Sequence, residues 1–338
     1  MSITNQMPLP DFFDSQRVKE VYRVPYRERA IAAEKWAKEL GIEPAASDRQ
    51  KIGLLLIDVQ NTFCIPDFEL FVAGKSGMGA VEDNIRLCQF IYRNLGCITE
   101  IIPTMDSHTA MQIFHPIFWV NDAGQHPEPA TNISLADVTE GVWKANPQLA
   151  HNLTAGDGDR LQQHALHYVT KLSEEGKYPL TVWPYHSMLG GIGHALVSAV
   201  EEAVFFHSIA RISPTKFELK GDNPLTENYS VLSPEVLDTI DRPIARKNAT
   251  LIDKLLDFDK LLIGGQAKSH CVAWTVDNLL TEIQNTVPTL AQKIYLLEDC
   301  MSPVVIPGVV DFSQAADDAF RRFTAAGMHS LESTDDLC

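Results

Sequence analysis

Cys271 is the residue of this sequence best placed for nucleophilic chemistry. It follows an apolar run, Lys260–Gly264, and a Gly264-Gly265 turn, and a segment with helical apolar spacing begins beside it. The pattern predicts a strand, a tight turn and a helix, with Cys271 at or just before the first helical turn. Unpaired N–H groups and the helix dipole favour a thiolate there. The alternative is that Cys271 is a small buried core residue.

Two charged residues could assist a nucleophile at Cys271. Covalent attack by a thiol needs a group that takes and returns its proton, and donors that stabilise the negative charge that develops. Asp58, which ends the apolar run Ile52–Ile57, could exchange the proton, and Lys220 could balance the charges of carboxylate and thiolate. Each also has an ordinary explanation, since Asp58 could cap a turn and Lys220 could be a solvated surface lysine.

The elements that must position these residues alternate between strand and helix. This alternation is typical of an α/β sheet, whose ligands bind beyond the carboxyl ends of the strands, and Asp58, Asp106, His108 and Cys271 all lie at such ends. We expect strands at Ile52–Ile57, Cys97–Pro103, Leu180–Trp183, Phe205–Ile212, Lys216–Leu219, Lys260–Gly264, Lys293–Leu297 and, at an edge, Met328–Leu331. We expect helices at Gly79–Leu95, His194–Val204 and Gln314–Ala326.

Two segments lie outside this pattern. Residues 1–50 form an extension in front of the main domain, residues 51–335, and the helix-forming composition of Arg27–Leu40 predicts a docked helix there. A polar insertion spans about residues 120–178 and includes a helix expected at Asp157–Glu175. Long loops without function are uncommon, so a lid and an oligomer contact are the two uses to consider.

Three separated segments together resemble the nicotinamidase and isochorismatase-like superfamily of cysteine hydrolases. They are Leu54–Phe63, with Asp58 in a D-x-Q-x-x-F motif; Phe217–Gly221, followed by Tyr229-Ser230; and Gly264–Val272, where Lys268 stands in place of the usual threonine. The resemblance covers about residues 50–335 apart from the insertion. It implies the isochorismatase-like hydrolase fold, a three-layer α/β/α arrangement around a mainly parallel central sheet.

The resemblance also implies a role for each residue of the site. Cys271 would be the nucleophile, Asp58 the general base and then general acid, and Lys220 the third catalytic residue. A cis peptide bond between Gln266 and Ala267 would aim the backbone N–H of Ala267, with that of Cys271, at the oxyanion. Lys268 adds a positive charge near the nucleophile, which could depress the pKa of the thiol or influence substrate choice.

Four further residues resemble the metal ligands of the nicotinamidase branch. Asp106 and His108 have D-x-H spacing at a strand end, His115 lies in an F-H-P-I-F segment, and His186 lies in W-P-Y-H. One carboxylate and two or three imidazoles suit one Zn²⁺, Fe²⁺ or Mn²⁺ ion and leave positions open for water or a substrate nitrogen. A histidine in an apolar stretch is usually structural, and that alternative stays open for His115. We expect the remaining histidines at the surface or in packing: His126, His151, His164, His167, His194, His207, His270 and His329.

The bulk composition narrows the class of protein. The 338 residues are 45% hydrophobic and 21% charged, which is typical of a globular protein with a full core. The net charge of -16 argues against nucleic-acid partners and anionic membranes. The N-terminal segment has neither a basic region nor an apolar core, so we expect a cytoplasmic protein. Six cysteines without C-x-x-C spacing predict reduced thiols.

We therefore expect a metal-dependent cysteine amidase with a small amide substrate. The leading hypothesis is a nicotinamidase of NAD salvage, converting nicotinamide to nicotinate and ammonia through a thioester, and the resemblance implies a homo-oligomer. Because the extension and the insertion could select a larger substrate, an amidase or carbamoylase acting on a larger amide or ureido compound is the near alternative. A catalytically silent interaction protein is the alternative from another class.

Overall fold

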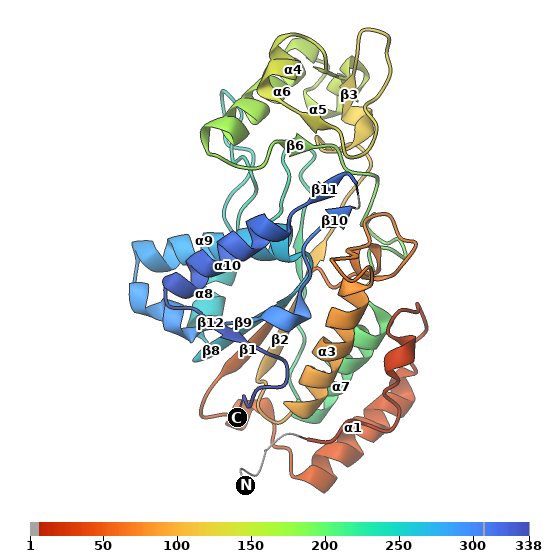
Figure 1. Ribbon diagram of the computed structural model, residues 1–338, viewed down its shortest axis with the longest axis vertical. Coiled ribbons are helices and arrows are strands. Elements are labelled where there is room, and N and C mark those ends of the chain that lie inside the picture. Colours follow the sequence, from red (N-terminus) through yellow and green to blue (C-terminus); the bar gives the residue numbers. More distant parts are fainter. Residues whose placement is uncertain (1–6, 307, 338) are drawn as a thin grey trace. The chain divides into compact units, whose positions relative to one another are not determined.

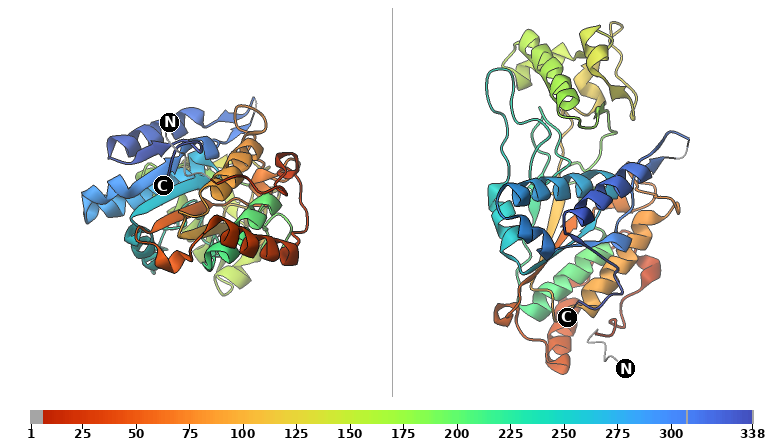
Figure 2. Two further views of the ribbon diagram at one scale, coloured as in Figure 1. Left: turned by 90° about the horizontal axis from the view of Figure 1, so that it is seen from below. Right: turned by 60° about the vertical axis from the view of Figure 1, so that its left-hand side comes forward.

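The computed structural model describes residues 7–306 and 308–337, which form two compact units (Figures 1 and 2). Unit 1 comprises Met1–Met105, Ala195–Glu218 and Ala249–Cys338, and unit 2 comprises Asp106–His194 and Leu219–Asn248. In the described part of the chain, no helix combines the length and the apolar character that a membrane crossing requires.

A six-stranded sheet with the order β12-β9-β8-β1-β2-β7 is the centre of unit 1. Its strands are β1 (Ile52–Ile57), β2 (Glu100–Asp106), β7 (Glu218–Lys220), β8 (Lys260–Gly265), β9 (Ile294–Leu297) and β12 (His329–Leu331). Every residue of β1 is buried, which explains its uninterrupted apolar run, because helices cover both faces of a parallel sheet. β1 and β8 pair in parallel with Ile57 opposite Gly265, so both strands end at the same level.

Helices cover both faces of this sheet. α3 (Gly79–Arg93) and α7 (Ser198–Arg211) lie on one face, and α8 (Ala249–Asp257), α9 (Ala273–Asn285) and α10 (Ser313–Ala325) lie on the other (Figures 1 and 2). Unit 1 also contains the short helix α2 (Asn61–Cys64) and the antiparallel pair β10 (Val305–Ile306) and β11 (Val310–Asp311). The three-layer α/β/α fold predicted from the sequence is confirmed.

The N-terminal helix α1 (Tyr26–Leu40) packs against the outer side of α7 (Figure 1). The Tyr22 hydroxyl and Arg29 Nε donate hydrogen bonds of 2.8 and 2.6 Å to the two oxygens of Glu202 on α7. The Trp36 ring meets the Phe206 ring edge-on at 6.0 Å between centroids. The extension therefore folds as a docked helix, one residue longer than predicted.

Two of the predicted strands are wrong in type or place. The strand expected at Phe205–Ile212 is the second half of α7, which begins at Ser198 and not at His194. Because α7 is covered by α1 on its outer side, it is apolar on most of its surface, and periodicity does not distinguish such a helix from a buried strand. The segment Leu180–Trp183 supplies only β6 (Leu180–Thr181), which pairs antiparallel with β4 (Asn132–Ile133) in unit 2.

Unit 2 contains the predicted insertion. Its longest helix, α6 (Gly158–Glu174), buries the whole predicted stripe, Leu161, Ala165, Tyr168, Val169 and Leu172. The helices α4 (Leu135–Thr139) and α5 (Ala150–Leu153) pack against α6, and β3 (Trp119–Val120) pairs with β5 (Lys144–Ala145). The insertion is therefore a folded part of unit 2.

The cysteines divide into two kinds. Cys64, Cys88, Cys271 and Cys300 are buried and are not in disulfide bonds. Cys97 is in a disulfide bond, so the expectation of reduced thiols is wrong for that residue, and Cys338 lies outside the described residues.

Candidate active site

Asp58 follows β1 directly and is fully buried. Its φ of 48° is in the left-handed region, which aspartate tolerates better than most residues. Thr104, on the neighbouring strand β2, accepts a 3.0 Å hydrogen bond from the Asp58 backbone N–H and donates one of 2.5 Å to Asp58 Oδ1. Thr104 therefore orients the carboxylate. Thr104 was not predicted as a site residue, because it lies just after the strand expected at Cys97–Pro103, whereas β2 extends to Asp106.

Cys271 lies in a single π-helical turn, Lys268–Val272, between β8 and α9. Such turns are frequent at functional sites. The peptide bond between Gln266 and Ala267 is cis, and Cys271 is 8% exposed. Gly265 has a φ of 123°, and a Cβ at this position would lie 2.1 Å from the Ile57 carbonyl oxygen. Only glycine therefore lets the end of β8 approach β1 closely enough to place this turn beside the end of β1.

The side chain of Gln266 anchors the same turn. It is fully buried, and its Nε2 donates a 2.8 Å hydrogen bond to Asp83 Oδ2 on α3, while the backbone N–H of Gln266 donates to the Ile57 carbonyl. Asp83 also accepts a 2.8 Å hydrogen bond from Arg86. Burial raises the pKa of the Asp83 carboxyl, and its hydrogen bonds partly oppose that rise.

Lys268 has partners that neutralise its charge. Its Nζ lies 2.9 Å from Glu298 Oε1 and 3.5 Å from Asp317 Oδ1. The same nitrogen lies 4.5 Å from the centre of the Phe320 ring, a cation–π contact. These contacts direct the Lys268 ammonium to acidic and aromatic partners, and an influence of Lys268 on the Cys271 thiol stays a prediction.

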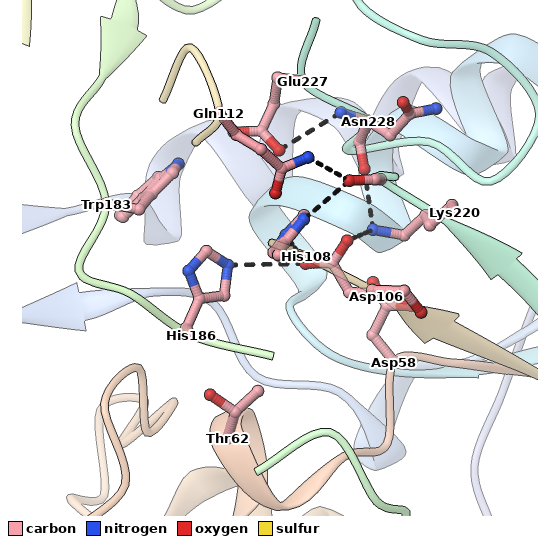
Figure 3. Close-up of polar contacts among 12 residues, drawn as sticks. Asp58, Thr62, Asp106, His108, Gln112, Trp183, His186, Lys220, Glu227 and Asn228 are labelled. Atoms are coloured by element: carbon pink, nitrogen blue, oxygen red, sulfur yellow. Dashed lines mark hydrogen bonds and ion pairs between the residues drawn. The ribbon is translucent and has the colours of Figure 1, made fainter. Parts of the chain in front are cut away.

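Asp106, His108 and His186 form a buried cluster in unit 2 (Figure 3). Asp106 Oδ2 lies 2.7 Å from His108 Nε2 and 3.5 Å from His186 Nε2, and one ligand atom from each residue lies within 4.8 Å of the others. Burial raises the pKa of Asp106, but the charges of His108 and Lys220 outweigh it and hold that pKa well below its usual range. Burial lowers the pKa of His186, which favours a neutral imidazole with an available lone pair.

His115 lies beside this cluster and is suited to join it. Its ring centre is 5.9 Å from that of His108 and 5.8 Å from that of His186. Nδ1 donates to the Ala110 carbonyl at 3.2 Å, whereas the buried Nε2 has no hydrogen-bond partner among the described residues. Burial, followed by the two neighbouring histidines, lowers the pKa of His115 to about 3. A neutral imidazole with an unused buried lone pair fits a metal ligand.

Lys220 belongs to the same cluster. Its buried Nζ donates hydrogen bonds of 2.8 Å to Asp106 Oδ1 and to the Asn228 carbonyl (Figure 3). The backbone explains why these segments meet, since Ser107 N–H donates to the Lys220 carbonyl and His108 N–H donates to the Ser187 carbonyl. Of the predicted site residues, unit 2 thus holds Lys220 and the four metal-type residues. Unit 1 holds Asp58 and the segment Gln266–Cys271.

Solved structures share this architecture. A nicotinamidase/pyrazinamidase from Acinetobacter baumanii is similar over 86% of this chain and 100% of its own, with a TM-score of 0.52 and 18% identity. The yeast nicotinamidase is similar over 83% of this chain and 99% of its own, with a TM-score of 0.51 and 17% identity. The chain has the fold of the nicotinamidases. A second structure of the yeast nicotinamidase, bound to the inhibitor nicotinaldehyde, gives a TM-score of 0.52 at 16% identity.

At these identities the likeness to nicotinamidases concerns the fold. No protein-family model matches the chain, and a search of curated proteins found no significant match. The fold explains why three of the predicted site residues lie at the ends of strands. Asp106 ends one parallel strand of the sheet, and Asp58 and Cys271 follow two others.

Proposed function

We propose that this protein is a metal-dependent cysteine amidase that hydrolyses a small carboxamide, with nicotinamide as the first substrate to test. The observation that carries the proposal is the position of Cys271. It lies on a π-helical turn that follows β8, in a chain with the nicotinamidase fold, and β8 ends at the same level as β1, which buried Asp58 follows. The two solved structures compared first are nicotinamidases by name, and one is also a pyrazinamidase, which supports nicotinamide as the first substrate to test.

In the proposed reaction, each catalytic residue acts at a particular step. Asp58 takes the proton of the Cys271 thiol, and Sγ attacks the carboxamide carbon, while the backbone N–H groups of Ala267 and Cys271 bind the oxyanion. The tetrahedral species collapses to a thioester as Asp58 returns the proton to the leaving ammonia. Asp58 then activates water, which hydrolyses the thioester and frees the thiol. Lys220 offsets the negative charge of the carboxylates during these steps.

The residues of unit 2 would hold a divalent metal ion. Asp106, His108 and His186 are the ligands whose atoms already converge, and His115 is the further candidate because of its unpartnered Nε2. An ion bound there would supply a Lewis acid for a heteroatom of the substrate. One carboxylate with two or three imidazoles suits Zn²⁺, Fe²⁺ or Mn²⁺.

Ammonia release from nicotinamide tests the proposal directly. We expect release by the native protein and a loss of at least about 10³-fold in Cys271→Ala, because no other group replaces the nucleophile. Cys88→Ala, which removes another buried free thiol from unit 1, is the matched control and should retain activity. Equal rates in the native protein and in Cys271→Ala would refute the mechanism. Hydrolysis of a larger amide or a ureido compound, without nicotinamide hydrolysis, would instead assign the near alternative.

A further inference from the structure

The carbonyl oxygen of Gly221 accepts two hydrogen bonds beside the metal-type cluster. His108 Nδ1 lies 3.0 Å from it and Gln112 Nε2 lies 2.6 Å from it. Gly221 has a φ of 84°, and a Cβ there would lie 2.6 Å from His108 Cε1 and 2.9 Å from Asp106 Oδ1. The backbone of Gly221 therefore packs directly against two of the candidate metal ligands, with no space for a side chain.

The orientation of Gln112 is fixed by its own contacts. Its side chain is fully buried, and its Oε1 accepts a 3.0 Å hydrogen bond from the Thr109 backbone N–H. The amide nitrogen must then face the opposite way, where it donates to the Gly221 carbonyl and, at 3.3 Å, to that of Asn223. Gln112 thereby ties the segment that follows His108 to the segment that follows Lys220.

These contacts determine which nitrogen of His108 faces the cluster. A carbonyl oxygen only accepts hydrogen bonds, so Nδ1 carries the proton, and Nε2, which lies 2.7 Å from Asp106 Oδ2, is the ligand atom. Histidines that bind metals usually donate their second ring N–H to such an acceptor, and loss of the acceptor weakens metal binding.

We propose that Gln112 is a positioning residue for the metal ion. It holds the Gly221 carbonyl in the place where that carbonyl fixes the tautomer and the ring orientation of His108. The inference rests on the metal site of the proposed function and not on its amidase step. Gln112 would touch neither the ion nor the substrate.

Gln112→Glu tests this role with almost no change in shape. The glutamate keeps the acceptor for the Thr109 N–H and removes the donor to the Gly221 carbonyl. We expect the dissociation constant for Zn²⁺, measured by competition with a chromophoric chelator, to rise about 10- to 100-fold. Gln112→Met, which introduces no buried charge, should weaken Zn²⁺ binding to a similar extent and serves if Gln112→Glu does not fold.

Asn94→Asp in unit 1 is the matched control. It makes the same amide-to-carboxylate change at a buried side chain that donates a 3.0 Å hydrogen bond to the Phe90 carbonyl. We expect it to lower stability and to leave Zn²⁺ affinity within about twofold of the native value. A general structural effect would weaken Zn²⁺ binding in both variants equally and would overturn the positioning role.

Histidine tautomers give a readout that a purely structural role would not change. Long-range ¹H–¹⁵N spectra of the Zn²⁺-bound native protein should show His108 protonated at Nδ1, and Gln112→Glu should show a mixture of tautomers. Unchanged affinity together with an unchanged spectrum would overturn the inference, as would a native protein that does not bind Zn²⁺. A native protein that binds Zn²⁺ but releases no ammonia from any amide would refute the amidase proposal alone.

Discussion

Lys220 Nζ donates hydrogen bonds to Asp106, a candidate metal ligand, and to the backbone carbonyl of Asn228. Both bonds hold the ammonium end of the side chain. A bound dication and the Lys220 ammonium would therefore share Asp106, each contacting the same carboxyl group.

A buried histidine outside the site, His207, should make the stability of the protein depend on pH. His207 on α7 is 1% exposed, its Nε2 lies 2.8 Å from the Ile98 carbonyl, and burial lowers its pKa to about 4. In the unfolded chain the pKa of histidine is about 6.5. The unfolded state therefore binds a proton first as the pH falls. The contribution of His207 to stability is complete above about pH 6.5 and is lost as the pH falls to about 4.

His207→Gln should flatten this dependence. Urea unfolding between pH 7.5 and 4.5 should show the native protein losing up to about 3 kcal/mol more stability than the variant over this window. His151→Gln, a change at an exposed histidine, should follow the native curve. Parallel curves for the native protein and His207→Gln would show that His207 is not the titrating group.

At the scale of elements, the junction of β1 and β8 depends on one glycine. Gly265→Ala would place a Cβ 2.1 Å from the Ile57 carbonyl oxygen at a positive φ, so the strands would have to separate. We expect a loss of stability of at least about 3 kcal/mol, or no folded protein, as measured by urea unfolding. Gly264→Ala is the adjacent control, because its nearest neighbours would be at ordinary contact distances of 3.6 Å or more. Equal stabilities of the two variants would contradict this reading.

The elements that the sequence predicted best are those with one clear physical signature. β1 and β8 are short apolar runs that end at Asp58 and at two glycines, and both were placed within one residue. α7 was misread because its buried surroundings remove the polar face that identifies a helix. The segment around β6 has the composition of a strand, but its partner in the structure is β4 of the insertion, which no local pattern reveals.

Some residues of the candidate site could be predicted from the sequence, and others could not. Asp58, Asp106, His108 and Cys271 could be found because each has chemistry of its own and lies at the end of a predicted strand. Thr104 and Gln112 could not, because their importance comes from contacts with segments 46 and 109 residues away. Such supporting residues have ordinary side chains, and only the fold shows which atoms they orient.

At the scale of the whole molecule, metal binding should stabilise the folded protein. A ligand that binds the native state alone at 100 times its dissociation constant contributes about 2.7 kcal/mol. We expect Zn²⁺ to raise the thermal unfolding temperature, a chelator to reverse this, and Asp106→Asn to abolish it. Asp159→Asn, at an exposed carboxylate of α6, should respond like the native protein. An equal rise in Asp106→Asn would indicate binding elsewhere.

Some whole-molecule properties stay predictions from composition and resemblance. A net charge of -16 is unfavourable for binding polyanions, and a homo-oligomer and a cytoplasmic location remain expectations. The ligands of the proposed metal belong to unit 2, whereas the proposed nucleophile belongs to unit 1. The Zn²⁺ and Cys271→Ala experiments therefore report on different parts of the chain.

The docking of α1 on α7 has a consequence for synthesis on the ribosome. α1 ends at Leu40 and α7 begins at Ser198, so roughly 160 residues must be added before the partner of α1 exists. At about 5–20 residues per second, this delay is on the order of ten seconds or longer. During that time Arg29 and Trp36 lack their partners Glu202 and Phe206, so α1 cannot dock until α7 has been synthesised.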